Sequence, residues 1–180
     1  MNRRSDLIWG TLGEGGLILA MAAIGWAAGM PLIFASLGPT AYELVELPHM
    51  RSARAYNIIV GHFVGLAAGF FALWVLHAWS EPNVLAAGVV TAPRLWAVAM
   101  AAAVTTLLNL LLKAGQPAAL ATTLLVTLGA MQTRKSAIAI VAGVLIMAAI
   151  GEPVRRIRLR AMAGRGSTSQ EKISGAFGVR

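Results

Sequence analysis

The sequence predicts an all-α, polytopic membrane protein with four transmembrane helices and two short helices. Of its 180 residues, 58% are apolar and only 12% are charged, whereas charged residues make up about 25% of a typical soluble domain. The apolar residues form blocks long enough to cross a bilayer as a helix, which takes about 20 residues. Apolar and polar residues do not alternate along these blocks, which disfavours a β-barrel.

Four apolar blocks have the length of a transmembrane helix, at residues 15–34, 58–78, 95–112 and 136–150. The fourth block is the shortest, but Val154 and its neighbours can extend it. Asp6 and Glu14 interrupt the basic region that a cleaved signal peptide would carry before the first block. We therefore predict an uncleaved first helix.

Two further stretches, residues 39–47 and 117–131, are too short to span a bilayer alone. Each begins at a proline, which suits the first turn of a helix because its missing N–H is not needed there. Both stretches are candidates for re-entrant helices, which are tolerated in a membrane where they pack on protein or line a cavity. The alternatives are an interfacial helix for the first and a short, tilted span for the second.

The order of the segments is long–short–long, followed by long–short–long. This order suggests a two-fold internal repeat of residues 15–78 and 95–154, an organisation known among membrane transporters. We assign residues 1–154 to a transmembrane domain. Residues 155–180 form a basic tail whose Gly, Ser and Gln content predicts flexibility.

The net charge of +8 is concentrated in the tail, where seven of the 15 Lys and Arg residues follow Pro153. Basic residues favour the cytoplasmic side, so we expect both termini there, in a bacterial inner (plasma) membrane. The tail is a candidate for binding anionic lipid headgroups. Nucleic acid is not an expected partner, because no nucleic-acid-binding fold or aromatic platform accompanies the charge.

Glycines at four-residue spacing mark two helix faces. Gly61, Gly65 and Gly69 lie in the second block, and Gly25 and Gly29 make a shorter pattern in the first. Small residues at this spacing let helix backbones approach closely in lipid. We predict that these faces pack closely against other helices. A homo-oligomer is a separate candidate assembly.

Six polar residues are candidates for binding a substrate: Ser36, Thr40, Arg54, Asn57, His62 and Gln116. Ionisable residues inside a membrane are usually functional, and His62 could relay a proton or bind an anion. Alternatively, it is a neutral histidine bonded to a carbonyl of a neighbouring helix. The chain has no cysteine and no recognisable metal-binding or catalytic motif, so we expect no metal, no cofactor and no enzymatic activity.

The stretch from Ser36-Leu37-Gly38-Pro39-Thr40-Ala41 to Asn57-Ile58-Ile59-Val60-Gly61-His62 resembles the HPP family of small integral membrane proteins. Pro48 falls where the family has a loop proline, and Asn57, Gly61 and His62 match its Asn-x-x-x-Gly-His pattern. The second-half His-Pro-Pro motif is degenerate, because Gly115-Gln116-Pro117 keeps one proline and lacks the histidine. Tyr56 stands where an arginine is frequent. The resemblance covers about residues 15–154.

The resemblance implies a four-helical fold, and some plastid and cyanobacterial members are associated with nitrite transport. We therefore expect a transporter or channel-like protein for a small solute, with an inorganic anion such as nitrite as the candidate. The alternative is a membrane scaffold or accessory subunit that does not transport.

Overall fold

The computed structural model describes the backbone of residues 3–176 and the side chains of residues 6–163. All regular structure in these residues is helical, which confirms the predicted fold class. The helices are α1 (Arg3–Ala28), α2 (Leu37–Glu46), α3 (Ala55–Val75), the 3-10 turn η1 (Ala78–Ser80), α4 (Val84–Ala87), α5 (Ala92–Leu111), α6 (Pro117–Thr127) and α7 (Arg134–Ala176).

The four predicted transmembrane helices are present as long apolar helices, at Asp6–Ala28, Ala55–Val75, Ala92–Leu111 and Arg134–Ala163. The predicted first block, residues 15–34, was wrong at its end. Helix α1 stops at Ala28 because Gly29 adopts a left-handed conformation with a φ of 62°, which glycine tolerates and helices commonly use to terminate. Residues 30–34 are apolar but not helical.

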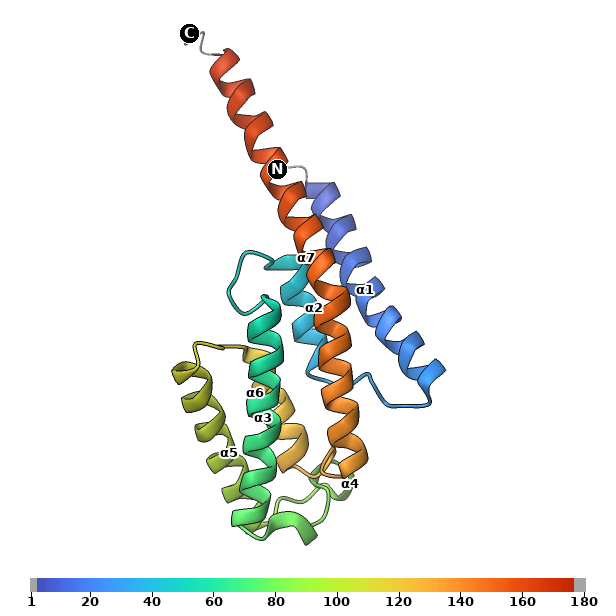
Figure 1. The fold of residues 1–180 in the computed structure, drawn as a ribbon, viewed down its shortest axis with the longest axis vertical. Helices are drawn as coiled ribbons and strands as arrows, with labels where there is room; N and C mark the ends of the chain where they lie inside the picture. Colours follow the sequence, from blue (N-terminus) through green and yellow to red (C-terminus); the bar gives the residue numbers. More distant parts are fainter. Residues whose placement is uncertain (1–2, 177–180) are drawn as a thin grey trace.

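The two short helices lie in the middle of the bundle. Helix α2 packs against α7 and α6 packs against α3, while α1 flanks α7 and α5 flanks α3 (Figure 1). Helix α6 begins at a proline, and the Gln116 side chain before it accepts a hydrogen bond from the backbone N–H of Ala118 at 3.3 Å. Whether α2 and α6 are re-entrant stays a prediction.

The helix contacts keep the same pattern when the halves are exchanged. The pairs α1–α2, α2–α7 and α1–α7 correspond to α5–α6, α6–α3 and α5–α3. A methyl group on Gly61 would meet the Ala114 carbonyl oxygen and the Gln116 side chain; on Gly143 it would meet the Leu32 carbonyl oxygen and the Phe34 side chain. Each of these pairs of residues is 82 positions apart (61 and 143, 114 and 32, 116 and 34). This geometry supports the proposed internal repeat.

Helix α7 continues without a break past residue 154, so the backbone does not mark the proposed boundary between domain and tail. Glu152 forms ion pairs with Arg155 and Arg156, at 2.8 and 2.7 Å, and charge pairs three and four residues apart support a helix. The predicted flexibility rests on residues 164–180, whose side chains lie outside the described part of the chain.

Two arginines of the predicted tail are bound to the rest of the protein. Arg158 is 1% exposed and donates hydrogen bonds to the Val45 carbonyl and to Asp6, at 3.2 and 3.1 Å. Arg155 donates to the Pro48 carbonyl at 2.9 Å. The start of α1 therefore lies beside α7 at the end of the bundle from which the tail extends (Figure 1).

Candidate functional site

His62 lies fully buried on α3, at 0% exposure; α3 packs against α6, and the His62 ring faces Thr40 of α2. Its ring Nδ1 lies 2.8 Å from the Ile58 carbonyl oxygen, one turn earlier on the same helix. A neutral ring that donates from Nδ1 carries its lone pair on Nε2, and Nε2 faces the Thr40 hydroxyl at 3.5 Å. Nδ1 is therefore bonded within α3 itself, and Nε2 is the ring nitrogen that faces another helix, at Thr40 of α2.

A run of hydroxyl groups continues from His62 between the short helices. Thr40 donates a hydrogen bond to the Ser36 carbonyl at 3.0 Å, and the hydroxyls of Ser36 and Thr122 lie 2.8 Å apart. All four side chains are 0% exposed. Ser36, Thr40 and His62 are thus brought together as one polar cluster. Thr122 completes it and was missed by the sequence analysis; its only signal was a threonine within an uncharged short helix.

A neighbouring threonine joins α6 to α3 and α5. The Thr123 hydroxyl is 3.2 Å from the Gly65 carbonyl oxygen and 2.9 Å from the Thr105 hydroxyl. Both threonines are fully buried. The interior between α3, α5 and α6 is therefore linked by hydroxyl groups rather than packed by apolar side chains alone.

Gln116 and Glu43 form a second buried cluster at the start of α6. Gln116 donates to the Ser52 carbonyl at 3.2 Å, and both Gln116 and Ser52 offer hydrogen bonds to the Glu43 carboxylate. Glu43 is 8% exposed. It belongs to α2, which is not among the four spans. Burial raises the pKa of this carboxyl from its ordinary value of 4.5, and the hydrogen bonds from Ser52 and Gln116 oppose the rise.

Asn57 and Arg54 stand at the start of α3, beside this second cluster. The Asn57 amide donates to the carbonyls of Lys113 and Gly115, at 3.3 and 3.2 Å, and so fastens the loop before α6 to α3. The Arg54 side chain is exposed. The six predicted residues therefore do not share one point, because Ser36 and Gln116, which precede the two short helices, belong to different clusters.

The glycines of α3 lie directly against α6. A methyl group on Gly61 would come within 2.7 Å of Gln116, one on Gly65 within 2.5 Å of the Ala119 carbonyl oxygen, and one on Gly69 within 2.9 Å of Val126. Gly25 instead faces the chain that follows α1, and Gly29 ends α1 with open space around it. The pattern in α1 therefore shapes a turn rather than a contact with a distant helix.

Among the residues whose side chains are described, no three His, Cys, Asp or Glu side chains gather closely enough to hold a metal ion. The clusters consist instead of hydroxyl, amide and imidazole groups, together with one carboxylate.

The model of the family described as HPP, transmembrane region, matches residues 1–162. The chain belongs to this HPP transmembrane family. The match covers α1 to α6 and α7 as far as residue 162, and it confirms the resemblance drawn from the residues around Asn57 and His62. As an HPP-family member with four apolar helices of spanning length, the chain is an integral membrane protein. No curated protein and no solved structure matches it.

Proposed function

We propose that this HPP-family protein is a transporter or channel-like protein for a small solute, with an inorganic anion such as nitrite as the candidate. The observation that carries the proposal is His62, an ionisable side chain fully buried against Thr40 between α2, α3 and α6. Ionisable residues in this setting usually face a substrate or ion pathway. Hydroxyl groups can donate hydrogen bonds to a small anion, and His62 can do so from Nε2 once that nitrogen is protonated.

Comparison with the second half of the chain indicates that His62 is not needed for packing. At the spacing of 82 residues, the counterparts of His62 and Gln116 are Val144 and Phe34, and both are buried. At these two positions the second-half contact is apolar where the first-half contact is polar. Because apolar side chains suffice at these positions in one half, His62 and Gln116 are candidates for function.

In this proposal the two clusters have different roles. Ser36, Thr40 and His62 contact the solute between the helices. Asn57 and Gln116 hold the loops before α6 and α3 in place. Arg54, exposed at the start of α3, attracts anions to that end of the bundle by its charge. Such attraction through a positive potential raises the local concentration of an anion.

Nitrite uptake into proteoliposomes tests the proposal. His62→Val is the informative variant, because Val144 occupies the corresponding position in the second half. His77→Asn is the matched control, since His77 is exposed at the end of the same helix and asparagine tolerates its left-handed backbone. We expect uptake by the native chain and the control, and at least a tenfold loss in His62→Val. Unchanged uptake by a folded His62→Val variant would overturn the role of His62.

The alternative function, a non-transporting scaffold or accessory subunit, is supported by the basic tail, where seven of the 15 Lys and Arg residues follow Pro153. It predicts a different outcome in cells that lack the native chain. His62→Val would then restore the native phenotype, whereas replacing the tail residues Arg165 and Lys172 by glutamine would not. The transport proposal predicts the opposite pattern.

We also propose that both termini face the cytoplasm of a bacterial inner membrane. Because the chain has no cysteine, single cysteines report sidedness without background. Thr133→Cys and Ala163→Cys place an exposed thiol at the two ends of the span in α7. A membrane-impermeant maleimide should label only Thr133→Cys in intact cells. Labelling of Ala163→Cys alone would show that the C-terminal end of α7 faces outward, contrary to the proposal.

A further inference from the structure

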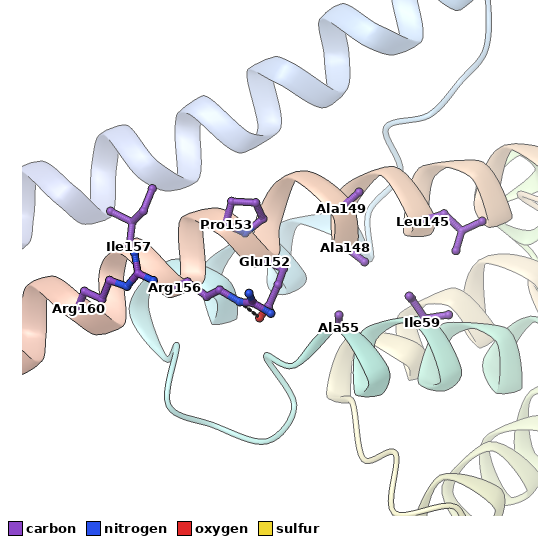
Figure 2. Close-up of a pocket in the computed structure, with 10 residues that line it drawn as sticks. All are labelled: Ala55, Ile59, Leu145, Ala148, Ala149, Glu152, Pro153, Arg156, Ile157 and Arg160. Carbon is purple, nitrogen blue, oxygen red and sulfur yellow. Dashed lines mark hydrogen bonds and ion pairs between the residues drawn. The ribbon is translucent and has the colours of Figure 1, made fainter.

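A groove of about 610 Å³ runs along the outside of α7 beside the start of α3. Its walls are apolar over most of their length: Ala55 and Ile59 come from α3, and Leu145, Ala148, Ala149 and Ile157 come from α7 (Figure 2). Both helices are long enough to span the membrane. The groove therefore lies where acyl chains of the bilayer can reach it.

One end of the groove carries positive charge. Arg156 and Arg160 line it, and both are exposed. Glu152 also lines it, but Arg155 binds both oxygens of that carboxylate, at 2.8 and 2.9 Å. Arg156 contacts Glu152 through its Nε at 2.7 Å, and its side chain remains 66% exposed. The acid is thus already paired, and the guanidinium groups of Arg156 and Arg160 are available to an external anion.

We propose that this groove binds one anionic phospholipid, with an acyl chain along the apolar walls and the phosphate at Arg156 and Arg160. A fully apolar partner would leave the arginines unused, and a soluble anion would leave the walls unused. Arginine is suited to phosphate because its planar guanidinium donates two parallel hydrogen bonds. Basic pockets between transmembrane helices bind anionic headgroups for this reason.

The small side chains of α7 create the space for the acyl chain. Ala148 and Ala149 occupy the stretch where α7 passes Ala55 and Ile59 (Figure 2). The inference is independent of any transported solute. It also differs from general attraction of headgroups to the tail, because it requires the shape of the groove as well as charge.

Thermal unfolding of the purified full chain in dodecyl maltoside tests the proposal. We expect dioleoylphosphatidylglycerol to raise the unfolding midpoint by about 5 °C or more at roughly a hundredfold excess over its dissociation constant. Dioleoylphosphatidylcholine and inorganic phosphate alone should give no comparable shift. Arg156→Gln combined with Arg160→Gln removes the charge, and Ala149→Phe fills the apolar part without changing the charge; each should abolish the shift.

Matched controls separate the groove from charge in general. Arg134→Gln with Lys135→Gln neutralises two exposed basic residues at the other end of the span in α7, and Arg165→Gln with Lys172→Gln neutralises two in the tail. Both controls should retain the native shift. A full shift in the Arg156 and Arg160 variant, or in Ala149→Phe, would overturn the proposal, as would an equal shift with phosphatidylcholine or phosphate. The arginine variant changes the charged end of the groove and Ala149→Phe changes its apolar part. If one of these two proteins misfolds, the other still tests the proposal.

Discussion

Replacing Gly65 by alanine tests the contact that fixes α6 on α3. The added methyl group would lie 2.5 Å from the Ala119 carbonyl oxygen and 2.9 Å from the Thr123 hydroxyl. The first neighbour is backbone, so it can move only if α6 moves with it. The second neighbour bonds to the Gly65 carbonyl and to Thr105, and both bonds stretch when the helices separate.

The expected loss follows from these contacts. Overpacking a well-packed interior costs about 1–3 kcal/mol. Loss of the two interhelical hydrogen bonds adds about 0.6 kcal/mol each in a membrane protein. Alanine favours a helix over glycine by about 1 kcal/mol, which offsets part of the loss. We therefore expect Gly65→Ala to lower the free energy of unfolding by about 1–3 kcal/mol.

Unfolding of the purified protein in mixed micelles of dodecyl sulfate, followed by circular dichroism, measures this change. Gly16→Ala is the matched control, because Gly16 lies on α1 with nothing within 4 Å of an added methyl group. Its stability should equal or slightly exceed that of the native chain. If Gly65→Ala were as stable as Gly16→Ala, the close approach of α3 and α6 would be wrong.

Three further changes give expectations of different sign and size. Arg94→Met should lower the free energy of unfolding by about 3 kcal/mol in the same assay, because the fully buried guanidinium donates four hydrogen bonds, three to backbone carbonyls and one to the Gln132 side chain. Arg94→Lys should recover part of the loss. Gly151→Ala should cost less than Gly65→Ala, because its methyl group meets the movable end of Leu44. Since burial raises the pKa of Glu43, protonation of its carboxyl should stabilise the native chain as the pH falls through that raised pKa towards 4.5. Glu43→Gln should flatten this part of the unfolding-midpoint curve between pH 8 and 4.5, and an unchanged curve would contradict the assignment.

Hydropathy and local motifs were sufficient for the fold class, the four spans and the family. They failed at the end of α1, where residues 30–34 read as membrane helix but run non-helically after Gly29. Leu32 and Phe34 are buried there against α7. An apolar side chain buried by a non-helical segment has the same hydropathy as one buried by a helix, so composition cannot separate the two.

The burial of two arginines could not be predicted from the sequence for a related reason. Arginine near the end of a span is expected at the interface, where it can snorkel. Arg94 and Arg158 are instead fully buried, because the last carbonyls of the short helices point at them: Thr127 accepts from Arg94 at 2.8 Å and Val45 from Arg158 at 3.2 Å. Free carbonyls at a helix end are good acceptors for a cation. Which arginine reaches which helix end depends on tertiary contacts that local sequence does not encode.

The two halves of the chain exchange their short helices. The first half supplies α2, which packs on α7 of the second; the second half supplies α6, which packs on α3 of the first. The glycines of α3 therefore have no surface to approach until α6 is in place, and Gly143 and Gly151 of α7 likewise depend on the segment around α2. A unit that cannot bury its packing face alone gains stability only by assembling with its neighbour. The same exchange places Thr122 of α6, from the second half, beside Ser36 of the first, so the hydroxyl cluster around His62 combines residues of both halves.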